Sequence, residues 1–389
     1  MKILMLHNRY QIRGGEDEST DLEISLLQDR GHTVELMEDF NDGIAGLASK
    51  VAAAGSAIWN EKWRKRIRDR LNGGRFDILH VQNHFPNISP SVYYAGYQTG
   101  VPVVQAVRNY RIVCPSANLF REGRYCADCI EDRFKFSAVK HRCYRQSRVG
   151  SATLSLSSAL HASIGTWNRR VTRYAAISKF VGDRLVQGGV PQERVVIKPN
   201  FVFSDPQRKY LSREKRRHLL YVGRIAPEKG IDILFEAYKQ SGTSIPLKVA
   251  GGGSVPTGFP EGVEILGRKE PHQIYDLMAE AIAVIMPGSW PEPFGRVAIE
   301  SFAVGTPVIA ADAGGLGEIV VDGRNGFKVK VGDVSGFADC LKIALANNNV
   351  WSVMSRNAIL DYRELYSPEA NYTRLIDIYS DAIQSKSAF

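Results

Sequence analysis

The chain has 389 residues, of which 44% are hydrophobic and 23% charged, a composition of soluble globular proteins and a length that suits two domains. No apolar run approaches about 18 residues, and residues 1–9 turn polar too early for a secretory signal, so we expect neither a spanning helix nor export. Five cysteines in a chain with this cytoplasmic character argue against a disulfide framework. Residues 1–200 carry 29 Lys/Arg against 19 Asp/Glu, which indicates an anionic partner or simply a basic surface.

Short apolar runs alternate with helical patterns through the first half of the chain. The runs are typical of buried parallel strands, and a helix is expected over Glu16–Asp29. A serine that follows the last run, Ser178, has the character of a helix N-cap. The expected strands are Ile3–Leu6, Thr33–Glu38, Asp77–Val81, Pro102–Val107 and Ala175–Ile177.

A segment with a proline and a run of charges, Asn200–Arg217, is the expected linker, and a second alternating series follows it. Its expected strands are His218–Val222, Pro246–Ala250, Gly262–Leu266, Ala283–Met286 and Pro307–Ala310, and its helices are Gly230–Lys239, His272–Ala281 and Arg296–Val304. The last helix begins at Ser367. The pattern predicts an α/β protein with two doubly wound domains, residues 1–200 and 201–366, that face a central cleft where ligands bind.

Two cations follow the first strand of the second series. Gly223 would let the backbone approach a ligand, and Arg224 and Lys229 stand near a helix start. A guanidinium, an ammonium and a helix dipole together suit a diphosphate. A capped helix with solvated charges explains the same residues.

Two carboxylates, Glu292 and Glu300, lie on either side of a Pro/Gly turn in the segment PEPFGRVAIE at residues 291–300. Glu292 stands in the turn, and Glu300 about two turns into the next helix. Such a pair could hold a sugar at one end and a ribose at the other, or serve as the acid and base of a hydrolase. Two glycine-rich turns, Gly14-Gly15-Glu16 and residues 313–318, each follow a strand and precede a helix, and could expose N–H groups to phosphate oxygens.

These segments, in this order and spacing, resemble the retaining glycosyltransferases of the GT-B type, group-1 family (family 4). The matching pieces are the GGE loop, the GRxxxxKG turn, the EPFG…E phrase and the GGxxE loop, which span residues 14–318. The resemblance implies the GT-B fold: an acceptor-binding first domain, onto which a C-terminal helix over about 367–389 packs back, and a donor-binding second domain.

The resemblance also implies roles for single residues. Arg224, Lys229 and Glu292 would be catalytic, the two cations neutralising the leaving diphosphate and the carboxylate binding hydroxyls of the donor sugar. No Asp-x-Asp motif ends a strand, so the cations would replace a metal and no cofactor would be required. The donor-binding set would be Gly14, Gly15, Gly223, Arg224, Lys229, Arg268, Glu292, Phe294, Gly295, Arg296, Val297 and Glu300.

The acceptor-side candidates follow two strands of the first domain: His84, Arg108, Asn109 and Tyr110. Many members of the family have a histidine in place of Arg108, near the reacting carbon, and another in place of Gln82, which weakens any assignment of a catalytic histidine. Arg108 could contact an anionic acceptor or the donor phosphate, or simply pair with a nearby carboxylate.

Four cysteines, Cys114, Cys126, Cys129 and Cys143, cluster in a long insertion. The CxxC pair has zinc-ribbon spacing, so a structural zinc is one expectation and reduced, packed thiols are the other. Cys340 is expected in the core.

Residues 59–71 combine a basic surface with Trp59, Trp63, Ile67 and Leu71 at helical spacing. Such a helix could lie on an anionic membrane surface, or pack its aromatic face on the sheet.

The resulting hypothesis is a metal-independent retaining glycosyltransferase (hexosyltransferase type, EC 2.4). It would move a sugar from a nucleotide-diphosphate sugar to a saccharide or lipid-linked acceptor in polysaccharide, lipopolysaccharide or glycolipid biosynthesis. We expect it in the cytoplasm, including the inner face of the membrane. A catalytically silent sugar-nucleotide-binding scaffold is the alternative. A nucleic-acid-binding protein fits the basic half, but no recognisable nucleic-acid module supports it.

Overall fold

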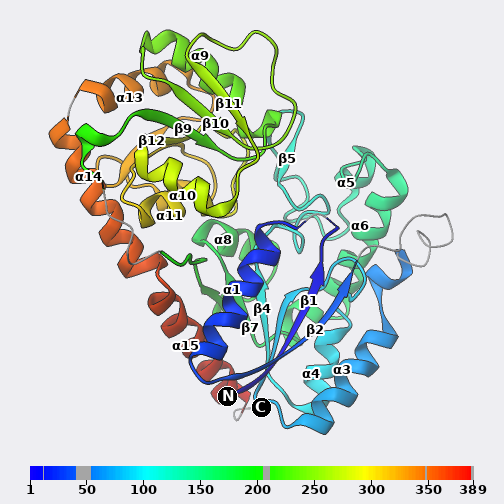
Figure 1. Cartoon of the computed structure of the whole chain (residues 1–389). Coiled ribbons are helices and arrows are strands. Elements are labelled where there is room, and N and C mark those ends of the chain that lie inside the picture. The colour runs from blue at the N-terminus through cyan, green and yellow to red at the C-terminus, as the bar shows by residue number, and fades with distance from the viewer. Residues whose placement is uncertain (12, 41–53, 205–210, 347, 387–389) are drawn as a thin grey trace. The chain divides into compact units, whose positions relative to one another are not determined.

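The computed structural model describes residues 1–11, 13–40, 54–204, 211–346 and 348–386 (Figure 1). It divides into two compact units. The first consists of Met1–Leu119, Cys126–Pro199 and the chain from Tyr372 onward, and the second of Phe120–Tyr125 and Asn200–Asn371. The expected linker begins where the second unit begins, although its residues 205–210 lie outside the described residues.

The first unit is built on a parallel six-stranded sheet with the order β2-β1-β3-β4-β7-β8. Five of these strands follow the apolar runs of the sequence, and β8 is a short sixth strand at the edge. Their bounds are β1 (Lys2–Arg9), β2 (Thr33–Phe40), β3 (Ile78–Asn83), β4 (Val103–Val107), β7 (Arg173–Ala176) and β8 (Val195–Ile197).

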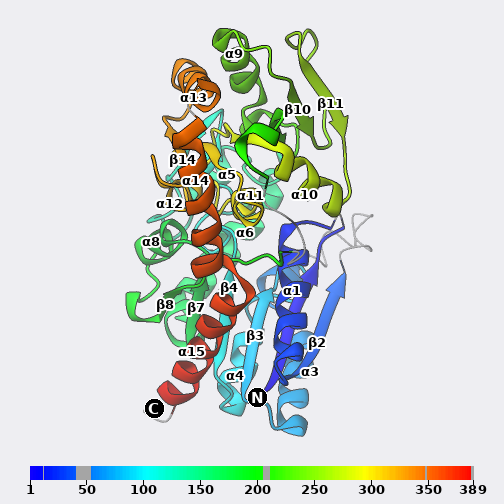
Figure 2. The same ribbon diagram turned by 60° about the vertical axis from the view of Figure 1, so that its left-hand side comes forward.

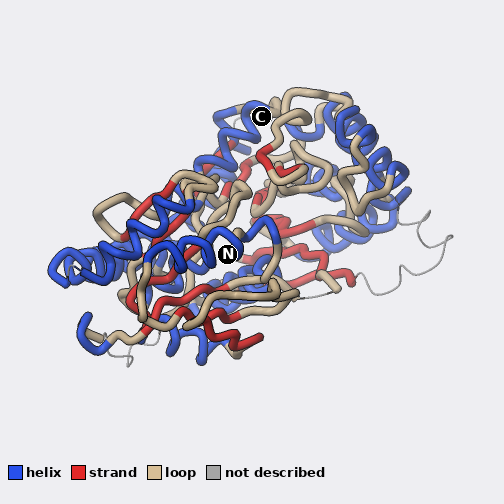
Figure 3. The backbone as a smooth tube through the Cα atoms, turned by 90° about the horizontal axis from the view of Figure 1, so that it is seen from above, coloured by secondary structure: helices blue, strands red, loops and turns tan. Residues whose placement is uncertain are grey.

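Helices cover both faces of this sheet, as the tube in Figure 3 shows. Their bounds are α1 (Gly15–Asp29), α3 (Glu61–Gly74), α4 (Val92–Thr99), α5 (Phe136–Lys140), α6 (Arg148–Ser163), α7 (Thr166–Arg169), α8 (Lys179–Gln187) and α15 (Pro368–Lys386). The expected cap is present, because the Ser178 side chain accepts a hydrogen bond from the Val181 N–H at the start of α8.

The C-terminal helix α15 completes the core of the first unit. Leu375 and Tyr379 of α15 pack in one buried cluster with Leu27 of α1, Ile3 of β1 and Ala175 of β7, which places α1 and α15 on the same face of the sheet (Figure 2). The opposite face carries α4. There Gly96 allows close packing, because a Cβ at this position would lie 2.4 Å from Val103 Cγ2.

The second unit repeats the architecture with the sheet order β11-β10-β9-β12-β13-β14, again parallel throughout. Its strands are β9 (His218–Val222), β10 (Leu247–Ala250), β11 (Val263–Gly267), β12 (Ala281–Met286), β13 (Val308–Ala311) and β14 (Gly326–Val329). Its helices are α9 (Ile231–Ser241), α10 (Pro271–Glu280), α11 (Arg296–Ala303), α12 (Leu316–Ile319), α13 (Val334–Ala346) and α14 (Asn348–Asp361), and a small ladder joins β5 (Phe120–Arg121) to β6 (Arg124–Tyr125).

Each sheet has one point where the strand order reverses direction. In the first unit, β2 and β3 lie on opposite sides of β1. In the second unit, β10 and β12 lie on opposite sides of β9. In doubly wound sheets, the helices that follow the two central strands diverge at such a point, which leaves a crevice at the carboxyl ends of the strands. Ligands of doubly wound sheets bind at such switch points.

The aromatic helix of the sequence is α3, and its apolar face is turned inward. Asn60 caps α3 by accepting from the Trp63 N–H, so Trp59 precedes the helix. Trp63, Ile67 and Leu71 are buried. These three side chains are therefore unavailable to lipid. Of the two alternatives that the sequence left open for this helix, the structure shows the one in which its apolar face packs inward. Among the described residues, no helix combines the length and apolar character needed to cross a bilayer.

Candidate functional site

The switch point of the second unit gathers the predicted cations. β9 ends at Val222, and Gly223 follows with φ +153°, a backbone conformation that favours glycine. The turn is held by the Tyr221 hydroxyl, which donates to the Arg224 carbonyl at 2.8 Å. The Arg224 side chain is 66% exposed and pairs with Glu228. Its guanidinium is thus accessible at the carboxyl end of the central strand.

Lys229 and Glu292 meet although 63 residues separate them in the chain. Lys229 Nζ lies 2.7 Å from Glu292 Oε2, and Trp290 Nε1 donates to the same oxygen at 2.9 Å. The ammonium also lies 4.9 Å from the centroid of the Trp290 ring. Both partners of the ion pair stay partly exposed, at 25% and 21%. The pair can therefore exchange its contacts for those of a ligand.

Glycines let the loops around this pair approach one another. Gly230 has φ +69°, and a Cβ there would lie 2.3 Å from the Pro287 carbonyl oxygen. Gly314 has φ +61°, and its Cβ would lie 2.4 Å from the Glu292 carbonyl oxygen, which accepts the Gly315 N–H at 2.7 Å. The predicted glycine-rich turn at residues 313–318 thus packs closely against the segment that carries Glu292.

The carboxylate phrase continues into α11. Gly295, at φ +108°, precedes the helix and offers no capping side chain, so the first-turn N–H groups form a site suited to an anion. Arg296 Nε lies 2.9 Å from Glu300 Oε1, one turn along the helix. Phe294 packs its ring against Tyr366, so only its backbone can face a ligand. Val297, in the first turn of α11, is half-buried.

Two features of this site escaped the sequence reading. The first is Trp290, which donates a hydrogen bond to the Glu292 carboxylate. The only sign of this contact in the sequence is an aromatic residue two positions before the glutamate. Three consecutive glycines, Gly251–Gly253, follow β10, and a Cβ on Gly251 would lie 1.8 Å from the Gly223 carbonyl oxygen. Arg268 lies over the same glycines, since a Cβ on Gly252 would come within 2.6 Å of its Nε.

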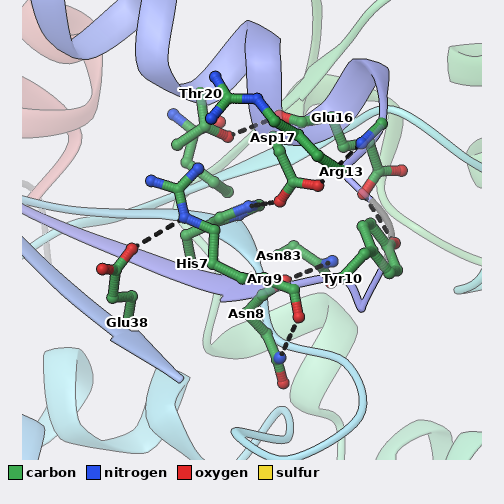
Figure 4. A network of polar contacts seen from close by, with 12 residues as sticks. His7, Asn8, Arg9, Tyr10, Arg13, Glu16, Asp17, Thr20, Glu38 and Asn83 are labelled. Carbon is green, nitrogen blue, oxygen red and sulfur yellow. Dashed lines mark hydrogen bonds and ion pairs between the residues drawn. The ribbon is translucent and has the colours of Figure 1, made fainter. Parts of the chain in front are cut away.

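In the first unit, the loop after β1 is braced by a polar network (Figure 4). His7 Nε2 lies 2.8 Å from Asp17 Oδ1, and the other Asp17 oxygen accepts the Gly14 N–H at 3.1 Å. Burial lowers the pKa of His7. Glu16 accepts from the Tyr10 hydroxyl at 2.8 Å and from Asn109 Nδ2 at 2.5 Å. The network therefore ties the GGE loop to the segment after β4.

The two glycines of that loop serve no evident structural need. Gly14 is in an extended conformation (φ −136°, ψ −174°) that any residue adopts. A Cβ on Gly15 would meet nothing within 4 Å. Backbone geometry therefore does not require glycine at position 14, and packing does not require it at position 15; the close approach of a ligand would explain both. The donor-binding roles of Gly14 and Gly15 remain predictions.

Three of the four acceptor-side candidates line one hollow at the ends of β3 and β4. His84, Arg108 and Asn109 border it. Tyr110 does not: its side chain is only 1% exposed and packs against Phe180, at 6.1 Å between ring centroids, and its acceptor-side role stays a prediction. The backbone turns after Asn109 and directs the tyrosine into the core.

Arg108 belongs to a buried charged cluster. It pairs with a carboxylate, which is one of the alternatives that the sequence left open. It donates to the Gln82 side-chain carbonyl, and its Nη2 lies 3.6 Å from Glu23 Oε2. Lys198 contacts the same Glu23 oxygen. Burial opposes ionisation of Glu23, but the charges of Lys198 and Arg108 prevail and hold its pKa below the usual range.

The five cysteines are present as thiols and not as disulfides. Among the residues that the structure describes, no group of three or more potential metal ligands comes together. Burial, with the nearby Cys114 thiol, raises the pKa of Cys129 to about 12, and Cys114 Sγ lies 3.1 Å from the Ser116 hydroxyl. Packed thiols describe this arrangement, and a structural zinc remains an untested prediction. Cys340 is partly buried against the core.

The fold is that of the GT-B glycosyltransferases, as the sequence predicted. The structure of Anabaena HepE in complex with UDP and glucose matches with a TM-score of 0.65 over 98% of this chain and 99% of that chain, at 19% identity. The sucrose-phosphate synthase of Thermosynechococcus elongatus matches with a TM-score of 0.68 over 99% of both chains, at 17% identity. At these identities the likeness concerns the fold alone.

The match to a family model lies in the second unit. Residues 203–361 match the model of the glycosyl transferases group 1. The D-inositol 3-phosphate glycosyltransferase of Gordonia bronchialis is 35% identical over 189 residues, which cover 43% of this chain and 41% of that protein. The chain thus spans about two fifths of the length of the curated relatives it matches.

Proposed function

We propose that the protein is a metal-independent, retaining glycosyltransferase of family 4, of the hexosyltransferase type. It transfers a sugar from a nucleotide-diphosphate sugar to a saccharide or lipid-linked acceptor in polysaccharide, lipopolysaccharide or glycolipid assembly. The observation that carries the proposal is the Lys229–Glu292 pair, which stands with Trp290 and Arg224 at the switch point of the second unit. The family match and the UDP bound to the similar Anabaena structure support the same ligand class.

Each charged group then has a chemical task. The bond between the sugar C1 and the diphosphate oxygen breaks, and negative charge accumulates on the diphosphate. Arg224 and Lys229 stabilise that charge more in the transition state than in the ground state, which lowers the barrier. Glu292 accepts hydrogen bonds from sugar hydroxyls and keeps C1 in place. The acceptor oxygen bonds to C1 on the face that the leaving group vacates, and its proton passes to a donor phosphate oxygen.

Substitution of the ion pair tests the proposal. We expect Lys229→Ala to remove the rise in melting temperature that the best nucleotide sugar produces in the unaltered protein. Glu292→Gln keeps the size of the side chain but removes its charge, and we expect a loss of turnover of at least a hundredfold with a smaller change in KM. Exposed residues of the same unit, Lys239 and Glu264, provide matched alanine controls that should leave both properties intact.

A sugar-nucleotide-binding scaffold would behave differently. It would bind a nucleotide sugar in a Lys229-dependent way, yet donor consumption would be equally low in the unaltered protein and in Glu292→Gln. Absence of any nucleotide-sugar binding would contradict both readings. Addition of EDTA should leave turnover unchanged, and a loss restored by Mg²⁺ or Mn²⁺ would refute metal independence.

The proposed place of action is the cytoplasmic face of a membrane. Lys62, Lys65 and Arg66 are exposed on α3, outside its buried apolar face, and could contact anionic lipid without insertion. Sedimentation with liposomes should then show binding to anionic but not neutral vesicles, and the binding should weaken as salt rises. Equal sedimentation with both vesicle types would remove the membrane from the proposal.

A further inference from the structure

Two hollows in the first unit share a wall formed by His84, Phe85, Arg111 and Ile112. Their volumes are about 40 and 30 Å³. The smaller lies among the residues that follow β3 and β4 and is bordered by amide side chains. The larger is bordered mainly by apolar side chains, among them Trp167. One side chain, Arg111, thus faces both a polar and an apolar hollow.

The lining of both hollows contains no aspartate or glutamate among the described residues. Arg108 and Arg111 border the smaller hollow together with Gln82, Asn83, Gln105 and Asn109. Glu16 approaches from the GGE loop, but both of its carboxylate oxygens accept hydrogen bonds, from Tyr10 and Asn109. The surroundings therefore offer donors and positive charge to whatever occupies the hollow.

Arg111 is held in place without a carboxylate partner. Nη1 donates to the Pro115 carbonyl at 2.9 Å, and the guanidinium lies 4.0 Å from the centroid of the Phe85 ring. The Arg111 Nε is buried and makes no hydrogen bond within the described part of the chain, and no described carboxylate forms an ion pair with this residue. A guanidinium fixed on one face and short of an acceptor is preorganised for an oxyanion.

We propose that Arg111 binds an anionic group of the acceptor, a phosphate or carboxylate carried by the saccharide. This inference rests on the proposed function, because it assigns the substrate class of the acceptor. The neighbouring His84 adds no charge of its own, since burial lowers its pKa to about 3. The apolar wall of the larger hollow limits water near the guanidinium and so strengthens its attraction for the anion.

A donor phosphate could satisfy the same guanidinium, so the experiment must separate the two sources. Glucose, glucose 6-phosphate and glucuronate form a neutral, phosphorylated and carboxylated series. Binding of each is measured by calorimetry and by thermal shift on the full chain. We expect at least one of the two anionic sugars to bind and glucose to bind at least tenfold more weakly.

Three variants decide the source. Arg111→Gln should weaken the anionic sugar about tenfold or more and leave nucleotide-sugar binding intact, whereas Lys229→Ala should do the reverse. Arg111→Lys keeps the charge but loses the planar fork, so we expect an intermediate loss; it also serves if Arg111→Gln does not fold. Arg133→Gln, at an exposed arginine of the same unit, is the matched control.

Equal binding of neutral and anionic sugars would overturn the inference. Loss of anionic-sugar binding in Lys229→Ala but not in Arg111→Gln would overturn it too, because the anion would then occupy the donor site. Failure of the proposed function would give a different result. No nucleotide sugar would then bind or be consumed, whether or not the anionic sugars bind.

Discussion

The two units each bring a carboxylate against a lysine, but in opposite environments. Glu23 of the first unit is 1% exposed, and Lys198 and Arg108 lie against it. Glu292 of the second unit is partly exposed and holds Lys229 and Trp290. The buried Glu23–Lys198 pair is closed off from a ligand, while the exposed Lys229–Glu292 pair can exchange partners. On the proposed function, burial therefore separates the charges that act on the fold from those that bind the donor.

The largest expected effect comes from removal of the buried carboxylate. Glu23→Ala leaves Lys198 and Arg108 without the carboxylate between them, and we expect it to lower the free energy of unfolding by about 3–5 kcal/mol. Glu292→Ala should cost less than about 1 kcal/mol, because its ion pair is solvated. Urea unfolding of both variants measures the difference. Equal losses of unfolding free energy in the two variants would show that burial does not decide how much each carboxylate contributes to stability.

Backbone strain should also affect the exposed pair. Ala at Gly230 must adopt a left-handed conformation and place its Cβ against the Pro287 carbonyl, so we expect a stability loss of about 1–3 kcal/mol together with weaker nucleotide-sugar binding. Gly242, with φ +64° and no atom within 4 Å of its Cβ, is the matched control for strain without a clash. Unchanged binding in Gly230→Ala would show that this turn does not position Lys229.

Acid should destabilise the first unit more than the second. Burial lowers the pKa of His80 to about 4, whereas the unfolded chain takes up this proton near pH 6.5. The unfolded state therefore binds more protons between these values, and stability falls as the pH drops from 6.5 towards 4, by up to about 2 kcal/mol for His80 at pH 5. His7, His84 and His161 have pKa values lowered in the same direction.

The second unit contributes His218, whose pKa burial lowers to about 4. Hydrogen exchange at pH 7 and pH 5, corrected for intrinsic rates, should show protection lost preferentially in β1, β3 and β4. A uniform loss across both sheets would contradict the expected difference between the units.

The smallest expected change in stability concerns the GGE loop. Gly15→Ala adds a methyl group in open space at the start of α1, so stability should stay unchanged or rise by up to about 1 kcal/mol. If a donor phosphate approaches this backbone, nucleotide-sugar affinity should nevertheless fall. An unchanged thermal shift with nucleotide sugar would remove Gly15 from the donor site.

The strands were predictable because they are continuous apolar runs bounded by turn residues. His218–Val222 forms β9 over the expected bounds, whereas the short edge strands β8 and β14 offered too few residues for a pattern. The start of α3 was misplaced by two residues. Trp59 shares the helical spacing of Trp63, but the side chain of Asn60 between them caps the helix, and only α3 itself is helical.

Site residues were predictable where a motif fixes the backbone and less so where side-chain direction decides. Lys229 and Glu292, which the motifs placed at one donor site, lie in contact. Tyr110, in contrast, is adjacent to Asn109 in sequence yet enters the core, because direction along an irregular turn cannot be derived from spacing. The glycines Gly251–Gly253 were overlooked because only the approach of the Gly223 carbonyl shows why a side chain is excluded there.

The contact between Tyr379 and His80 has a consequence for how the chain is made. The Tyr379 hydroxyl lies 2.6 Å from His80 Nδ1, so a residue near the end of the chain fills the core of the unit that is synthesised first. On the ribosome, residues 200–371 emerge before α15 can dock. The first unit therefore waits with an apolar face uncovered while the second folds, and a nascent chain stopped before Tyr372 would be a target for chaperones and proteases.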